Sequence, residues 1–132
     1  MKIDGKEVLI LHVKKKWWDM IKSGEKPEEY RRMTLYWIKR LVDIVPYIVE
    51  YRSQKGSVIS QDTGKAPIFK KFNEVWLLCG YPKLTEADKI IKWKNPTIYI
   101  REGFPEWGAP ENESVFVIKG VCEKFEDYKR NL

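Results

Sequence analysis

The spacing of apolar residues changes twice within the first third of the chain. A continuous apolar run covers 8–13 and predicts a central strand that is buried on both faces. Within 14–23 the apolar residues recur at spacings of three and four, which predicts a short helix that Gly24 can end. After the turn at this glycine, we expect 26–32 to form a second strand.

The middle of the chain predicts one more helix and a long polar loop. Thr34 is a suitable N-cap for a helix at 35–42, whose apolar residues lie on one face. Pro46 ends this helical pattern, and 47–51 has the composition of a strand. Residues 53–66 are polar and rich in turn formers, so we expect a loop there. Loops of this length are commonly functional or mobile.

Strand patterns dominate the C-terminal half. Apolar runs and alternation predict strands at 74–79, 97–101 and 114–119. Residues 84–94 fit either a helix that begins at 85–88 or an alternating strand, which Asn95-Pro96 would interrupt. The last segment, 123–132, is a polar tail. Many strands and two short helices in 132 residues predict a single α+β domain spanning 1–132.

The most informative chemistry lies at the start of the predicted strand 26–32. Along an extended strand, Glu29 and Arg31 share one face, whereas Glu28 and Tyr30 point the other way. Lys26 is out of phase with the first pair and joins it only if the regular strand begins after it. A lysine, a carboxylate and an arginine on one patch could bind a polar ligand. Glu29 and Arg31 also fit a solvated surface pair with little effect on stability.

The charge and the aromatic content favour a phosphate-bearing partner. The formal net charge is +6, and a basic surplus favours polyanions through counterion release. The chain also has six Trp, seven Tyr and five Phe. Some of these rings will fill the core, and others, beside lysines and arginines, suit stacking on bases.

Cysteine, histidine and hydropathy patterns give no sign of a metal, a cofactor or a membrane segment. Cys79 and Cys122 are far apart and lack the Cys-x-x-Cys spacing of zinc sites. His12 lies inside an apolar strand, where a structural hydrogen bond is more common than catalysis. No N-terminal apolar signal segment and no run of 18 apolar residues occurs. We therefore expect a cytoplasmic protein with reduced thiols, no cofactor and no membrane partner.

Several short motifs carry a family resemblance. They are Ser-Gly-x-Lys at 23–26, Glu-x-Arg at 29–31, Tyr-Trp-Ile-Lys-Arg-Leu at 36–41, Cys-Gly-Tyr at 79–81 and Gly-Phe-Pro-Glu-Trp-Gly-Ala-Pro-Glu at 103–111. With the preceding strand and helix, they resemble the ASCH family, a branch of the PUA-like β-barrels, and in particular its small phage and bacterial members. The resemblance covers 8–41 and 73–120. It favours the strand over the helix in 84–94.

The resemblance implies a small PUA-like mixed β-barrel flanked by short helices, with a groove between barrel and helices. Lys26, Glu29 and Arg31 would line this groove. Arg31 would bind phosphate or carboxylate as a bidentate fork, Lys26 would act as a point charge, and Glu29 would hold both cations or accept hydrogen bonds from a base. Tyr81 and Trp107 would stack on the base, although Trp107 fits equally well as a loop anchor packed on the barrel.

Three functions stay open at this point. We expect binding of RNA or a modified nucleobase in the Lys26/Glu29/Arg31 groove. Some small ASCH relatives are amidohydrolases of N4-acylated cytidine, and their machinery has a lysine, a threonine nucleophile three residues later and a glutamate elsewhere. Lys26 matches, but Glu29 stands where the threonine would be, and a carboxylate is a poor substitute for a hydroxyl nucleophile. A protein-interaction module without a nucleotide ligand is the third possibility.

Overall fold

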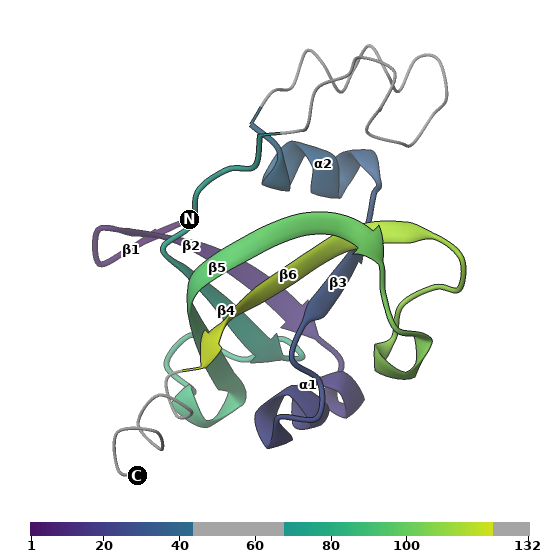
Figure 1. The fold of residues 1–132 in the computed structure, drawn as a ribbon. Coiled ribbons are helices and arrows are strands. Elements are labelled where there is room, and N and C mark those ends of the chain that lie inside the picture. The colour runs from purple at the N-terminus through teal and green to yellow at the C-terminus, as the bar shows by residue number, and fades with distance from the viewer. Residues whose placement is uncertain (44–67, 123–132) are drawn as a thin grey trace, which may run out of the picture.

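The computed structural model describes residues 1–43 and 68–122 (Figure 1). In chain order its elements are β1 (Lys2–Ile3), β2 (Lys6–Val13), α1 (Lys15–Ser23), β3 (Glu29–Arg32), α2 (Leu35–Leu41), β4 (Glu74–Cys79), the 3₁₀ turn η1 (Ala87–Lys89), β5 (Ile90–Glu102), the 3₁₀ turn η2 (Pro105–Trp107) and β6 (Ser114–Cys122). The predicted strand at 47–51, nearly all of the predicted loop at 53–66 and the tail at 123–132 lie outside the described residues.

The described strands form one six-stranded mixed sheet in the order β1-β2-β4-β5-β6-β3. Strands β2 and β4 run parallel, and the other neighbouring pairs are antiparallel. The sheet is not closed into the barrel that the resemblance implied, because no backbone ladder joins its two ends in the described part of the chain. Strand β3 is short and approaches β2 through a side chain instead. Arg31 Nη2 donates to the His12 carbonyl over 2.9 Å.

The connection between α1 and β3 is longer than the sequence predicted. Gly24 ends the helix with a left-handed φ of 89°. The predicted strand at 26–32 is wrong in its first residues, because the Lys26 N–H still donates to the Met20 carbonyl at 3.0 Å and Pro27 has no N–H for a ladder. Pairing with β6 therefore begins at Glu29.

Strand β5 is one element where the sequence predicted an interruption. It runs from Ile90 to Glu102, and Asn95-Pro96 produces a register shift between Lys94 and Thr97 without ending the strand. Asn95 takes a positive φ of 50°, which asparagine tolerates better than most residues. Within 84–94 the strand interpretation is correct only from Ile90 on, because the 3₁₀ turn Ala87–Lys89 precedes the strand and residues 84–89 are not part of it.

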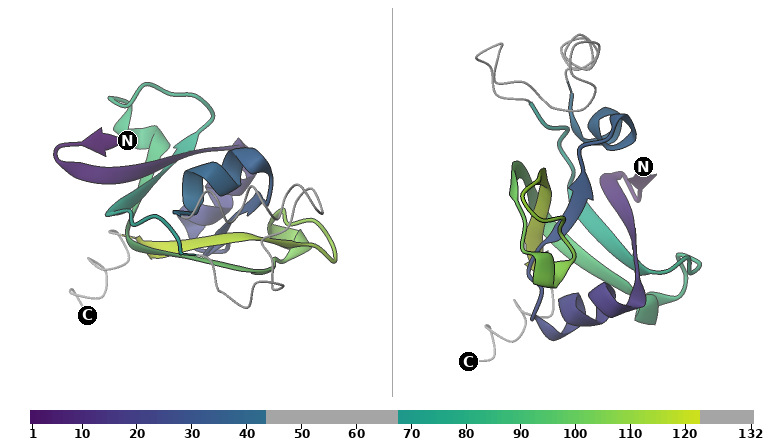
Figure 2. Two further views of the ribbon diagram at one scale, coloured as in Figure 1. Left: turned by 90° about the horizontal axis from the view of Figure 1, so that it is seen from above. Right: turned by 90° about the vertical axis from the view of Figure 1, so that its right-hand side faces the viewer.

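The main core lies on the inner face of the curved sheet. Helices α1 and α2 lie at its two ends (Figures 1 and 2). Leu9, Leu11 and Val13 of β2 face this core, and Val8 packs in a smaller cluster on the opposite face. The expectation that 8–13 is buried on both faces is therefore only partly correct, because Ile10 is half-buried and His12 is exposed on the second face.

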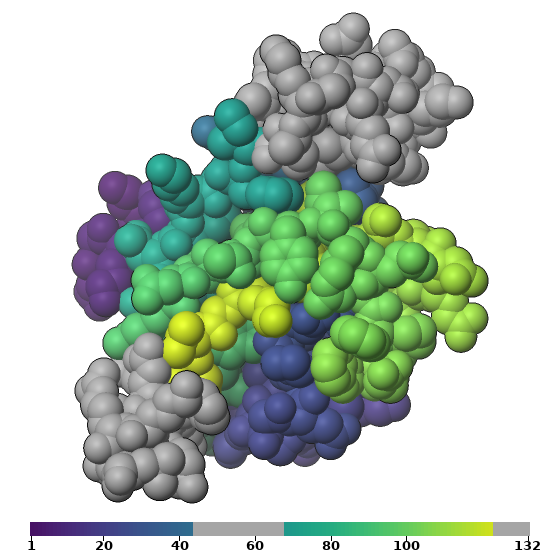
Figure 3. All heavy atoms as spheres, in the orientation of Figure 1, coloured from purple at the N-terminus to yellow at the C-terminus, as the bar shows by residue number. Residues whose placement is uncertain are grey.

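The outer face of β5 and β6 has a small core of its own under the loop that joins the two strands. Tyr30, Val115 and Val117 are buried there, with Ala109 from the loop. In Figure 3 the residues of β5 and this loop, in green, cover most of the face toward the viewer. The loop thus lies against the back of β3, on the side away from the inner core.

Candidate functional site

Lys26, Glu29 and Arg31 form a buried ion cluster at the junction of α1 and β3. Lys26 Nζ donates to Glu29 Oε1 at 2.6 Å, and Arg31 Nη1 donates to Glu29 Oε2, also at 2.6 Å. Lys26 is 2% exposed and Glu29 is 4% exposed. Lys26 Nζ also donates to the Trp107 carbonyl at 2.7 Å. The carboxylate thus holds both cations, as the sequence suggested, but inside the protein.

The other face of β3 carries a second buried carboxylate. Glu28 accepts a hydrogen bond from the Tyr30 hydroxyl at 2.6 Å and forms an ion pair with Arg101. Burial, and then the hydrogen bond to Glu28, raise the pKa of Tyr30 well above its ordinary value. Burial opposes the charge of Arg101, but hydrogen bonds to Glu28 and Tyr99 raise its pKa. The alternation of β3 therefore separates two ionic networks, one on each face.

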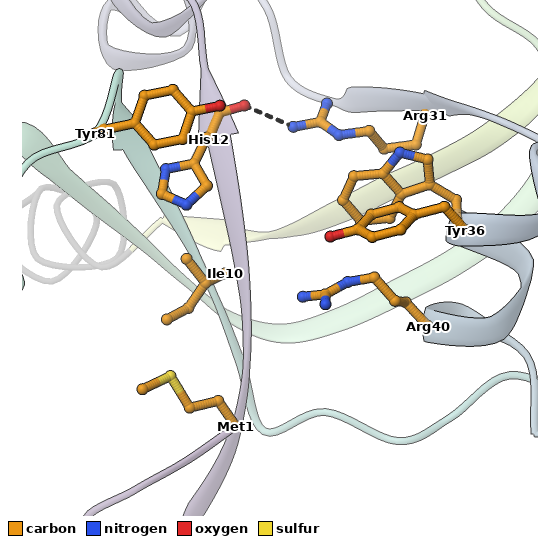
Figure 4. Close-up of a pocket in the computed structure, with 8 residues that line it drawn as sticks. Met1, Ile10, His12, Arg31, Tyr36, Arg40 and Tyr81 are labelled. Carbon is orange, nitrogen blue, oxygen red and sulfur yellow. Dashed lines mark hydrogen bonds between the residues drawn. The ribbon is translucent and has the colours of Figure 1, made fainter.

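An open cleft of about 570 Å³ lies between β2 and α2 (Figure 4). The described residues that line it are Met1, Ile10, His12, Arg31, Tyr36, Trp37, Arg40 and Tyr81. They include two arginines and several aromatic rings, and none of them is acidic. Figure 4 shows Ile10, His12 and Tyr81 on one wall, facing Arg31, Tyr36 and Arg40 on the other. The cleft is therefore positively charged and rich in ring faces.

One wall presents a stacked pair of rings. The ring centroids of His12 and Tyr81 lie 4.3 Å apart, with an interplanar angle of 22°. His12 Nδ1 lies 2.9 Å from the Gly80 carbonyl oxygen, and because a carbonyl only accepts, Nδ1 carries the proton. Tyr81 is 87% exposed, so one face of its ring remains available to a ligand.

The opposite wall alternates cations and rings. The guanidinium carbon of Arg31 lies 5.1 Å from the Trp37 ring centroid, and that of Arg40 lies 5.6 Å from the same centroid. Arg40 also lies 5.3 Å from the Tyr36 ring. Such cation–π contacts hold guanidinium groups in place without neutralising them. Arg40 makes no ion pair with any residue that the structure describes.

The structure brings only part of the predicted site to this cleft. Arg31 and Tyr81 line it, whereas Lys26 and Glu29 lie behind Arg31 in the interior. Trp107 is absent from the lining and packs with the Tyr30 cluster on the outer face of the sheet, while its carbonyl binds Lys26. The described contacts of Trp107 are therefore those of a loop anchor.

Sequence reasoning missed the contribution of α2 and of His12. Tyr36 and Arg40 are four residues apart, so they lie on one face of α2, away from the buried Ile38 and Leu41. The spacing of Tyr36 and Arg40 in the 36–41 motif is the sequence signal for this aromatic and cationic face.

Comparison with known protein families, with characterised proteins and with solved structures gives no match. The site must therefore be interpreted from its own geometry.

Within 1–43 and 68–122, no group of three or more His, Cys, Asp or Glu side chains is arranged to hold a metal ion. Cys79 and Cys122 are free thiols. In the same part of the chain, no helix has the length and apolar character needed to cross a membrane.

Proposed function

We propose that this protein is an ASCH-like domain that binds single-stranded RNA or a modified nucleobase in the cleft between β2 and α2. The observation that carries the proposal is the lining of the cleft, which combines Arg31 and Arg40 with exposed ring faces and no acidic side chain among its described members. Single-stranded nucleic acids are bound by this combination, with rings stacking on bases and cations contacting phosphates. The formal net charge of +6 supports the same class of partner.

Each wall has a separate part in this proposal. Tyr81, stacked on His12, offers a flat surface to a base, and the hydrogen bond to the Gly80 carbonyl fixes the histidine beneath it. Arg31 and Arg40 on the other wall contact the phosphate. Lys26 and Glu29 act behind Arg31 as its support and do not touch the ligand. A cytoplasmic location, expected from the sequence, belongs to the same proposal.

The nucleoside amidohydrolase alternative gains no support from the geometry. Lys26 and Glu29 are engaged with each other, with Arg31 and with the Trp107 carbonyl, and neither lines the cleft. A general base must come within hydrogen-bond reach of the proton it abstracts. Access to Glu29 would require the buried cluster to open first.

The test is the salt dependence of binding to a fluorescently labelled single-stranded RNA, measured by anisotropy. For single strands the slope of log K against log salt is about −0.7 for each phosphate neutralised. Arg40→Ala should therefore weaken binding and reduce the magnitude of the slope by about 0.7. Tyr81→Ala should reduce affinity by about 1–3 kcal/mol through lost stacking, and Tyr81→Phe should retain most of it.

Arg32→Ala is the matched control. Arg32 also lies on β3, next to Arg31, but it is 66% exposed, pairs with Glu113 at 3.7 Å and does not line the cleft. Its replacement should leave the slope unchanged. Equal losses in the Arg32 and Arg40 variants, or binding that does not respond to salt, would favour the protein-interaction alternative.

A further inference from the structure

The cleft and the buried ion cluster directly behind it together carry more positive than negative charge. Lys26 and Arg31 share the single carboxylate of Glu29. Arg40 adds a third cation, and like Arg31 its guanidinium lies within 6 Å of the centre of the Trp37 ring. These four groups carry three positive charges and one negative charge. Neighbouring like charges repel each other, and a bound anion relieves this repulsion.

Arg31 retains unused donors on one edge of its guanidinium. Of its five N–H groups, two on Nη1 donate to Glu29 Oε2 and the Tyr30 carbonyl, and one on Nη2 donates to the His12 carbonyl. The Nε N–H and the second Nη2 N–H have no partner among the described residues. Nε and Nη2 themselves form one edge of the guanidinium, opposite Nη1. A pair of parallel N–H groups is the fork that binds two oxygens of one phosphate.

We infer that the cleft recognises a phosphate monoester on a single nucleotide, either free or at the end of an RNA strand, in preference to an internal phosphodiester. This inference rests on the proposed function. A phosphate monoester has a charge of about −1.5 to −2 at neutral pH and three terminal oxygens, which match two excess positive charges and donors on two arginines. A phosphodiester offers one negative charge and two free oxygens. The cleft, at about 570 Å³, has the size of a pocket for one small ligand.

The two arginines have different parts in this recognition. Arg31 is fixed by Glu29 and by two backbone carbonyls, so its free edge has one orientation. Arg40 is held only by ring contacts among the described residues and can adjust to the third oxygen. Loss of Arg40 should therefore remove the preference for a monoester while leaving the base platform intact.

The experiment compares ligands that differ only in their ends, by calorimetry on the full chain. Adenosine, adenosine 5′-monophosphate, inorganic phosphate, and hexa-adenylates with 5′-phosphate, 3′-phosphate or only hydroxyl ends are the probes. We expect a phosphorylated end to bind at least about tenfold more tightly than the hydroxyl-ended strand, the effect of about one charge-assisted hydrogen bond. Arg40→Gln should make the affinities for the phosphorylated and the hydroxyl-ended strands equal, and Arg32→Gln should preserve the difference between them.

The possible outcomes separate this inference from the proposed function. Equal affinity for phosphorylated and hydroxyl-ended strands overturns the inference but leaves RNA binding standing. Binding of inorganic phosphate as tight as that of the nucleotide overturns it as well, because the base then contributes nothing. No binding of any probe refutes both. Because Arg40 is on the exposed face of α2, its variant should keep the wild-type melting temperature, so a lost preference cannot be attributed to unfolding.

Discussion

Replacement of Lys26 by methionine tests whether the buried ion cluster supports the fold. Methionine keeps the length of the stem but removes the ammonium, which donates to Glu29 at 2.6 Å and to the Trp107 carbonyl at 2.7 Å. Breaking a buried ion pair from one side costs about 3–5 kcal/mol. We expect the lower end, about 3 kcal/mol, because Arg31 still compensates Glu29. The orphaned carbonyl adds about 1 kcal/mol, so unfolding should become easier by about 4 kcal/mol.

Urea denaturation followed by tryptophan fluorescence measures this loss, and Lys15→Met is the control. Lys15 and Asp19 also have a nitrogen–oxygen distance of 2.6 Å, but their side chains are 78% and 48% exposed. The two pairs therefore differ in burial more than in geometry. The control should stay close to the wild type. Similar losses in both variants, or an unchanged urea midpoint for Lys26→Met, would contradict this reasoning. Burial would then not explain how much the ion cluster contributes to the free energy of unfolding.

Two further variants address the remaining buried carboxylates. Tyr30→Phe removes the hydroxyl that donates to Glu28 at 2.6 Å. We expect the free energy of unfolding to fall by about 1.5–3 kcal/mol, as for other hydrogen bonds to charged groups. An unchanged urea midpoint would contradict this expectation. Hydrogen bonds from Trp76 and Lys6 lower the pKa of Glu74 below its ordinary 4.5. The ionised carboxylate therefore stabilises the fold above that pH, and its contribution to the free energy of unfolding is lost on acidification. Glu74→Gln should therefore flatten the fall in unfolding free energy between about pH 5 and pH 3, and an equally steep fall in the variant would refute the assignment.

The helices and most strands could be predicted because their apolar spacing is a local property. The helix predicted at 14–23 is α1, Lys15–Ser23, and the pattern at 74–79 coincides with β4. Closure of the sheet could not be predicted in the same way. It depends on the tilt and stagger of all strands together, and neither quantity appears in the periodicity of one strand.

The candidate site was predictable only where it depends on alternation. Glu29 and Arg31 share a face of β3 because side chains alternate along a strand, and they form the expected pair. The burial of Lys26 could not be predicted, because its second acceptor, the Trp107 carbonyl, is 81 residues away in the sequence. The cleft has the same long-range origin, since Tyr81 reaches it from the end of β4.

The strand order also determines when the cleft can exist during folding. Strands β4, β5 and β6 are consecutive and antiparallel, so they can pair through the local connections 80–89 and 103–113. Strands β2 and β3 must then dock on the two outer edges of this meander, across much longer stretches of chain. Apart from Tyr81, every described residue that lines the cleft comes from 1–40. The binding surface is therefore completed only when the N-terminal segment docks, and because this segment also supplies much of the main core, the same step that completes the fold completes the cleft.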